Sequence, residues 1–156
     1  MRKTTIPKQN LGELKTPGYF ARITRQRGGG FLVEFPDLPG CLTEGDNLED
    51  ALAHAREALS GWLFVAIKNG DDIPEPEVYR GRSYYEIIPE LDVAVPLLLL
   101  MARCRRGLTQ KDVAKVLGIT QQAYRKFEIP GLSNPTVRTL GRLSRVFDTR
   151  FMIRAA

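Results

Sequence analysis

The side chains best suited to chemistry in this sequence are amides and cations that gather in one short segment, residues 109–128. A glutamine can make two hydrogen bonds to adenine in the major groove of DNA, and an arginine can make two to guanine. Each good pair discriminates between bases by about 1–3 kcal/mol. A helix that presents such side chains on one face fits that groove. The predicted DNA-binding residues are Gln110, Thr120, Gln121, Gln122, Arg125, Lys126 and Arg138.

The elements that would position these side chains form a predicted helix-turn-helix. Thr109 and Thr120 can each cap a helix, and Gly118 can supply the left-handed residue of the turn. Ala114 must be small because the second helix crosses close to it, while Ile119 fills the space between the helices. The alternative is an ordinary helical hairpin with a polar face. The other residues expected to point inward are Val113, Leu117, Ala123, Tyr124 and Phe127.

Tyr124 departs from the usual pattern, because a branched aliphatic residue normally occupies this position of the second helix. We therefore expect either wider packing between the two helices or a tyrosine hydroxyl that reaches the surface. Both possibilities would change the pose of the second helix.

Flanking helices are expected to extend this segment into a basic domain. Residues 97–101, with Cys104, predict a scaffold helix, and Asn134 followed by Pro135 is expected to begin the last helix. Residues 91–156 carry twelve Lys and Arg against four Asp and Glu, so phosphate attraction would supply much of any affinity for nucleic acid. The last helix should turn Val137, Leu140, Leu143 and Phe147 inward, and Arg103, Arg105, Arg106, Arg138, Arg142 and Arg145 should form basic surface.

The first half of the chain has the two-residue period of β-strands. Apolar and polar residues alternate over residues 19–24 and again over 31–35, which predicts a hairpin. The three glycines at 28–30 allow the positive φ angles of a tight turn. A phosphate cradle is the other use of such a triplet, but the spacing fits no P-loop or dinucleotide fingerprint and no helix follows directly. Residues 41–44 and 84–88 are two further predicted strands.

One long helix is expected between the third and fourth strands. Asn47 can accept hydrogen bonds from the amides of its first turn, and Gly70 can end it. Residues 71–77 hold four acids around two prolines and predict a loop. The apolar stripe that should face the sheet consists of Leu48, Leu52, Ala55, Leu59, Trp62 and Ala66.

Length and charge suggest two domains with different partners. A chain of 156 residues can form one or two compact domains. We expect a flexible basic arm over residues 1–17, which either lacks a role or contacts nucleic acid weakly, a domain over 18–90 and a second over 91–156. Residues 31–90 hold four Lys and Arg against thirteen Asp and Glu. An acidic surface suits a basic partner, and the basic second domain suits a polyanion.

Several kinds of chemistry are disfavoured by composition. The chain has two cysteines, Cys41 and Cys104, and one histidine, His54, too few and too scattered for a structural zinc site. Any nucleophilic triad would have to use His54. We therefore expect no catalytic residue, no metal site and no cofactor. The longest apolar run, residues 93–102, is about half of the roughly 20 residues that a bilayer crossing needs, so we expect a soluble protein.

Residues 29–46, with the sequence GGFLVEFPDLPGCLTEGD, run on into NLEDAL at 47–52 and closely resemble the HicB family of antitoxins. The order of parts also resembles that of family members with a C-terminal helix-turn-helix. The likeness covers about Tyr19 to Ile153 and is most specific over residues 31–59.

This resemblance implies an α+β protein, with a β-β-β-α-β partial RNase H-like domain followed by an all-α helix-turn-helix domain. It implies a cytoplasmic antitoxin that blocks a small basic mRNA-cleaving toxin, HicA-like, and represses its own operon as a dimer or tetramer. By analogy, residues 151–153 would form a strand that pairs between subunits. The residues expected to bind toxin are Phe31, Glu34, Asp37, Glu44 and Asp46.

Two other functions fit parts of the sequence. A nuclease would need several carboxylates converging on paired metal ions, but Asp37, Glu44, Asp46 and Glu49 cluster around one turn and one helix cap. A small-molecule-sensing regulator would need a pocket that Trp62, Tyr84 and Tyr85 could line, although such aromatics are more often core residues.

Overall fold

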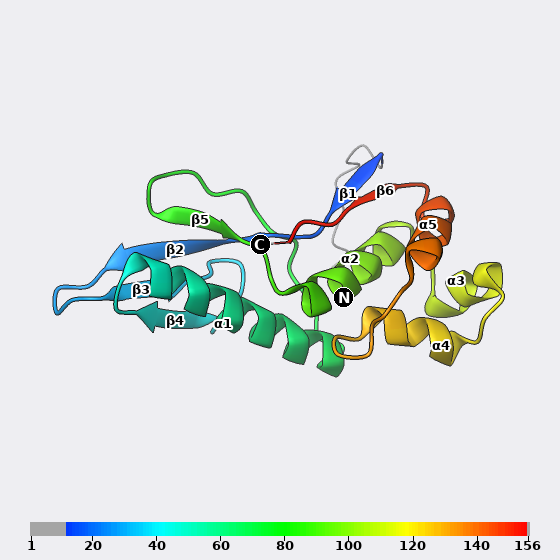
Figure 1. The fold of residues 1–156 in the computed structure, drawn as a ribbon, viewed down its shortest axis with the longest axis horizontal. Helices are drawn as coiled ribbons and strands as arrows, with labels where there is room; N and C mark the ends of the chain where they lie inside the picture. The colour runs from blue at the N-terminus through cyan, green and yellow to red at the C-terminus, as the bar shows by residue number, and fades with distance from the viewer. Residues whose placement is uncertain (1–11, 156) are drawn as a thin grey trace. The chain divides into compact units, whose positions relative to one another are not determined.

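The computed structural model describes residues 12–155, which form two compact units. Among the described residues, the sheet unit comprises 17–94 together with 154 and 155, and the helical unit comprises 12–16 together with 95–153. Strands followed by helices make this an α+β protein, as expected (Figure 1).

The sheet unit is built on four antiparallel strands in the order β4-β3-β2-β5. Ile23 pairs with Val33 and Ala21 pairs with Tyr85, which confirms the predicted hairpin and the fourth strand. Because side chains alternate along a strand, Ala21, Ile23 and Val33 are all buried on one face. The strands are β2 (Tyr19–Arg25), β3 (Phe31–Glu34), β4 (Leu42–Gly45) and β5 (Tyr84–Ile87).

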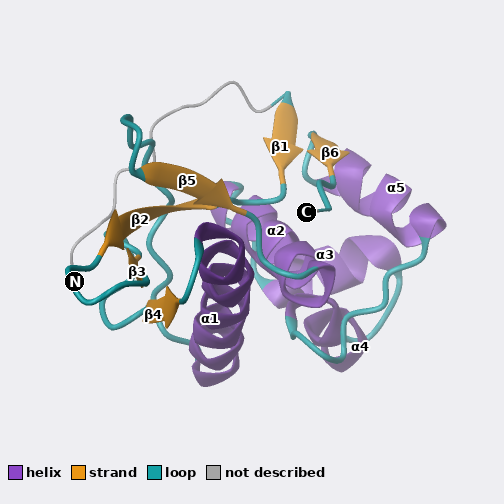
Figure 2. Cartoon of the chain, turned by 60° about the vertical axis from the view of Figure 1, so that its left-hand side comes forward, coloured by secondary structure: helices purple, strands orange, loops and turns teal. Residues whose placement is uncertain are grey.

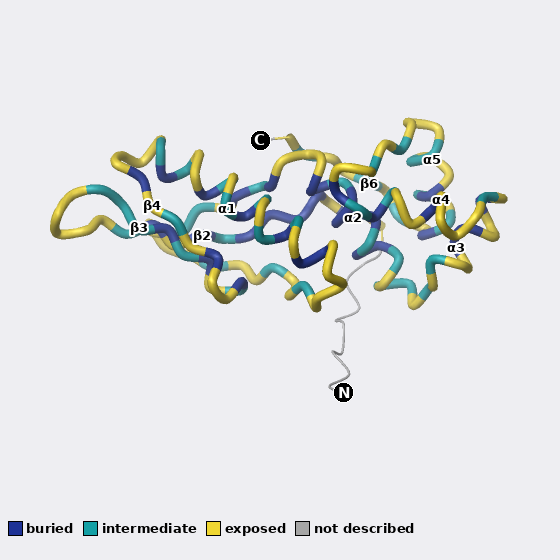
Figure 3. The backbone as a smooth tube through the Cα atoms, turned by 90° about the horizontal axis from the view of Figure 1, so that it is seen from below, coloured by how far each residue is buried: buried dark blue, intermediate teal, exposed yellow. Residues whose placement is uncertain are grey.

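Helix α1 (Leu48–Asn69) packs against this sheet (Figure 2). Its predicted ends are confirmed: the Asn47 side chain accepts a hydrogen bond from the Asp50 N–H, and Gly70 ends the helix at a φ of 72°. Buried and exposed residues alternate along α1, as dark blue and yellow bands show in Figure 3.

The buried face of α1 differs from the predicted stripe. Leu48 is 38% exposed, and Leu52 and Trp62 are only half-buried. The first two buried residues of the helix are alanines, because Gly45 lies very close to the helix backbone. A Cβ on Gly45 would lie 2.4 Å from the backbone nitrogen of Ala51. The residues that are buried are Ala51, Ala55, Leu59, Leu63, Ala66 and Ile67.

The helical unit is a bundle of helices that also contains one small sheet. Its apolar core includes Leu98, Val113, Tyr124 and Leu143. The scaffold helix begins before the predicted segment and contains Pro96; Cys104 lies in this helix as expected, with its side chain exposed. The helices are α2 (Leu91–Arg105), α3 (Gln110–Leu117), α4 (Gln121–Arg125), the 3-10 helix η1 (Lys126–Glu128) and α5 (Val137–Val146).

The small sheet of the helical unit corrects the prediction of a flexible arm. Strand β1 (Glu13–Lys15) pairs in parallel with β6 (Arg150–Met152). Leu14 is buried in the core, and the Thr16 N–H donates to the Met152 carbonyl over 2.9 Å. One apolar side chain and a strand ladder thus hold this part of the predicted arm in place, whereas residues 1–11 lie outside the described residues.

The predicted strand at 151–153 exists one residue earlier, and in this structure it pairs within the chain. The start of α5 was also wrongly predicted. Thr136, not Asn134, is the cap, since its hydroxyl oxygen accepts from the Thr139 N–H over 3.1 Å. The later start turns Val137 outward, 87% exposed, while Leu143 and Phe147 are buried as expected.

Candidate nucleic-acid interface

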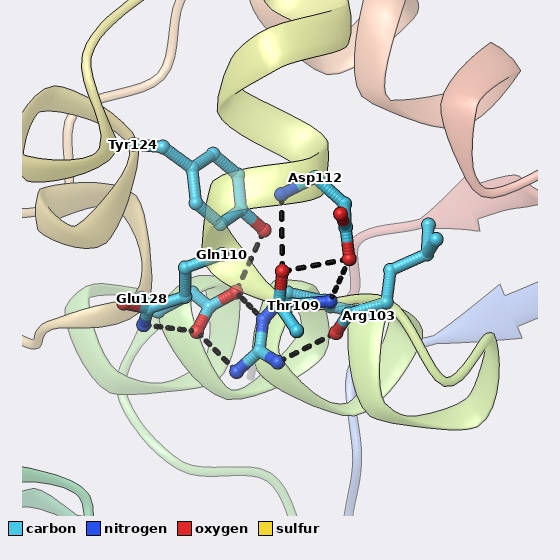
Figure 4. A network of polar contacts seen from close by, with 7 residues as sticks. Arg103, Thr109, Gln110, Asp112, Tyr124 and Glu128 are labelled. Atoms are coloured by element: carbon cyan, nitrogen blue, oxygen red, sulfur yellow. Dashed lines mark hydrogen bonds and ion pairs between the residues drawn. The ribbon is translucent and has the colours of Figure 1, made fainter.

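Helix α3 starts at a reciprocal cap between two side chains (Figure 4). The Thr109 hydroxyl oxygen accepts from the Asp112 N–H over 3.1 Å, and the Asp112 carboxylate accepts from the Thr109 N–H over 2.8 Å. The cap predicted at Thr109 is therefore confirmed. The Thr109 hydroxyl also donates to the Asp112 carboxylate over 2.6 Å, and this bond, followed by the one from the Thr109 N–H, holds the pKa of Asp112 below its ordinary value.

The turn between α3 and α4 follows the predicted chemistry. Gly118 has a φ of 70°, a left-handed conformation that glycine adopts at little cost, and its N–H donates to the Lys115 carbonyl. Thr120 then caps α4, since its hydroxyl oxygen accepts from the Ala123 N–H over 3.1 Å. The exposed position of Ala123 was not expected; α4 is only five residues long, and Tyr124 is its buried residue.

A buried carboxylate joins the elements of the helix-turn-helix. Glu128 is 2% exposed, and it accepts two hydrogen bonds from the Arg103 guanidinium, over 2.6 and 2.9 Å. Gln110 donates its side-chain amide to the same carboxylate over 3.0 Å, and the third nitrogen of Arg103 donates to the Leu108 carbonyl. Glu128 thus links α2, α3 and η1, and Figure 4 draws these contacts as dashed lines. No local sequence pattern indicates this group, because its members lie up to 25 residues apart.

The Tyr124 hydroxyl has a partner that was not expected. The side chain is fully buried, and its hydroxyl donates to Glu128 over 2.6 Å. The hydroxyl therefore does not reach the surface; it has a charged partner inside the unit. Burial, followed by the Glu128 charge, raises the pKa of this tyrosine, so it stays protonated as a donor.

The structure places most of the predicted base-reading residues together. Gln121, Gln122, Arg125 and Lys126 are exposed on α4 and the start of η1. The buried Tyr124, hydrogen-bonded to Glu128, fixes this short helix from its inner side. Its four exposed side chains can therefore enter the major groove of DNA.

The other three predicted DNA-binding residues are placed differently. Thr120 is exposed, but its hydroxyl oxygen is the helix cap, and Gln110 is half-buried with its amide nitrogen on Glu128. Arg138 is exposed on α5. Arg142, expected on the same basic stripe, donates to the Leu117 carbonyl over 2.6 Å and so anchors α5 to the end of α3.

The residues predicted to bind toxin differ in whether their side chains already contact other residues of the sheet unit. Glu44 and Asp46 are exposed, and Phe31 is half-buried. Glu34 forms an ion pair with Arg22 over 2.8 Å. Asp37 accepts from the Glu77 N–H and from the Tyr79 hydroxyl, which fastens the 70–83 loop and raises the pKa of Tyr79 to about 12.

The Asp112 cap makes stability depend on pH in a defined direction. Because the folded-state pKa lies below the ordinary 3.8, the stabilising contribution is complete above that value and is lost as pH falls through the folded pKa. We expect Asp112→Asn to lower the melting temperature near neutral pH and the difference from wild type to shrink as pH falls through the folded-state pKa of Asp112. Thermal melts followed by circular dichroism would measure it, with the exposed Glu57→Gln as the matched control. A difference that stayed constant with pH would contradict the ionised cap.

Two capped helices joined at the left-handed Gly118, the second of them with exposed amides and cations, place this unit in the class of helix-turn-helix DNA-binding domains. Residues 99–152 match the helix-turn-helix family, and residues 19–86 match the family described as HicB-like antitoxin of bacterial toxin-antitoxin systems. Within residues 12–155, none of the helices has the length and apolar character that a membrane crossing requires.

Curated relatives agree with these matches. The chain is 36% identical to antitoxin HicB 1 of Photorhabdus laumondii over 109 residues, which covers 70% of this chain and 68% of that protein. It is 30% identical to antitoxin HicB of Escherichia coli K12 over 104 residues, or 67% and 75% of the two proteins. The crystal structure of Burkholderia pseudomallei antitoxin HicB aligns with a TM-score of 0.42 at 19% identity, over 68% of this chain and 97% of that one. The chain belongs to the HicB family of antitoxins and carries a helix-turn-helix domain.

Proposed function

We propose that this chain captures and blocks a small basic HicA-like toxin that cleaves mRNA, and represses its own operon by binding operator DNA. The sheet unit would hold the toxin and the helical unit would read the DNA, with no catalytic residue of its own and in the cytoplasm, where the operator lies. One observation supports the proposal above all others. The same chain contains a HicB-type sheet unit and a helix-turn-helix whose second helix has exposed amides and cations.

Opposite charges on the two units support this division. Residues 17–94 hold seven Lys and Arg against fourteen Asp and Glu, whereas residues 95–153 hold eleven against three. An acidic surface accelerates encounter with a cationic protein, and a basic one attracts phosphates. Each unit therefore repels the ligand of the other.

Two copies of the helical unit would place two reading helices on successive half-sites of one operator. Helix-turn-helix dimers bind half-sites about one helical turn of DNA, or a multiple of it, apart. We therefore propose a dimer or tetramer as the DNA-binding form. Hydrodynamic measurement with and without operator DNA tests it, and a monomer on a single half-site would contradict it.

Reversing the exposed charges of the sheet unit should slow toxin capture. We expect Glu44→Lys and Asp46→Lys each to lower the association rate by about tenfold at low salt and by less at high salt, because exposed charges act mainly on encounter. Surface plasmon resonance with a catalytically inactive toxin measures this rate. Asp148→Lys, the same charge change at a 93% exposed side chain of the helical unit, is the control. Association rates equal to that control would reject Glu44 and Asp46 as part of the docking surface.

A further inference from the structure

The sheet unit contains an apolar groove that none of the predicted toxin-binding residues lines. It lies between the start of β4 and the second half of α1, with a volume of about 540 Å³. Leu42 and Val65 line it and are 62% and 55% exposed, although both are large aliphatic residues. Trp62 lines it as well, and its ring nitrogen donates to the Pro39 carbonyl, which fixes the indole in place. Tyr84 and Tyr85, the other aromatics considered for a ligand pocket, are not part of it.

Gly61 is the least expected residue of the groove. It lies inside the 22-residue helix α1, where glycine is less favourable than alanine. A Cβ at this position would meet no atom within 4 Å, so packing within the sheet unit does not require a glycine. A bare backbone in a groove allows another chain to approach closely.

The strand beside the groove is an edge of the sheet. β4 pairs only with β3 in the described sheet, and the Phe35 N–H donates to the Cys41 carbonyl. Since antiparallel pairs alternate, the peptide groups of Leu42 and Glu44 point away from β3, toward the open edge. His54 lies 2.7 Å from the Glu44 carbonyl and occupies that position, which leaves the peptide groups of Leu42 facing outward next to the groove. An edge of this kind can accept an extended segment of a partner.

Charge indicates which partner fits. Asp71 lines the groove, Asp72 follows it, and Glu44 and Glu57 are exposed on the adjoining strand and helix. An apolar anchor surrounded by acids suits an apolar side chain flanked by basic ones. A second copy of this sheet unit would instead bring like charges together, because the unit has fourteen acidic residues against eight basic ones, Arg154 included.

We propose that the groove between β4 and α1 is the docking site of the basic toxin, which lays an extended segment along β4 and seats an apolar side chain against Gly61. This inference rests on the proposed function. The acidic residues select and steer the toxin, while the groove determines how long it stays bound.

Filling the groove tests the inference without weakening the fold. Gly61→Leu places a side chain in the open space and replaces a poor helix former with a good one, so the melting temperature should be unchanged or higher. We expect this variant to bind inactive toxin at least ~100-fold more weakly by isothermal titration calorimetry, and Val65→Asp at least ~10-fold more weakly. Val78→Asp introduces the same charge at a side chain that is 75% exposed and outside the groove, and it should bind within twofold of wild type. Operator binding should be unchanged in all three.

The outcomes separate this inference from the proposed function. If wild type binds toxin and Gly61→Leu binds it equally well, the groove is not the docking site and the proposed function stands. If Gly61→Leu changes the oligomeric state and leaves toxin affinity unaltered, a second copy occupies the groove and the inference is wrong. If wild type binds no toxin at all, the proposed function itself fails.

Discussion

Glu128→Ala should destabilise the helical unit by about 3–5 kcal/mol, a large part of the roughly 5–15 kcal/mol that stabilises a typical domain. The substitution leaves the Arg103 guanidinium, whose side chain is only 15% exposed, without its carboxylate. It also removes the acceptor for the Tyr124 hydroxyl and for the Gln110 amide. A mostly buried cation, a buried hydroxyl and a half-buried amide each lose their partner, so the costs accumulate.

Urea unfolding with two signals can assign this loss to the helical unit. The chain has one tryptophan, Trp62, and it lies in the sheet unit, so its fluorescence follows that unit while circular dichroism at the helix band follows both. We expect Glu128→Ala to lower the midpoint of the helical transition and to leave the Trp62 midpoint in place. Asp148→Ala breaks an ion pair with Arg106 that spans 3.3 Å at a 93% exposed carboxylate, and it should cost less than about 1 kcal/mol. A Glu128 variant as stable as this control would contradict the network.

Gln121→Ala combined with Arg125→Ala should abolish selective operator binding. Each lost two-point contact with a base costs roughly 1–3 kcal/mol, so the pair should weaken binding to operator DNA by about 30-fold or more. Binding to unrelated DNA should change far less, since phosphate contacts supply most of it. Arg138→Ala should differ in kind: it should weaken operator and unrelated DNA alike and lower the salt dependence by about one counterion.

Mobility-shift titrations at several salt concentrations measure these differences. Arg27→Ala removes one positive charge from the exposed hairpin of the sheet unit and is the control for net charge. Toxin capture by the Gln121/Arg125 double variant should equal that of wild type. If the double variant instead lost toxin capture and kept its operator affinity, the assignment of the two functions to the two units would be wrong.

The sequence predicted best those features that depend on neighbouring residues. The caps at Asn47, Thr109 and Thr120 and the left-handed glycines at 70 and 118 each act through a hydrogen bond or dihedral within one turn, and all five are confirmed. The hairpin and the helix-turn-helix follow from such local signals.

Features that depend on distant residues were missed. The β1–β6 ladder joins residues from opposite ends of the chain, so no local pattern indicates it. The buried face of α1 depends on how closely Gly45 approaches Ala51, which favours small residues over the leucines that a hydrophobic stripe selects. The role of Tyr124 becomes evident only with Glu128 and Arg103 beside it. These three errors arose where tertiary contact, rather than propensity, decides the structure.

A gel-retardation experiment shows whether one chain binds both operator DNA and toxin. A labelled fragment of the DNA upstream of this gene is titrated with the purified chain at low salt, and a catalytically inactive form of the small basic protein encoded beside it is then added. The account predicts that the chain retards the fragment and that the added protein changes the retardation, by further slowing or by release. No retardation, or a retardation that the added protein leaves unaltered, would contradict a single chain that binds both ligands.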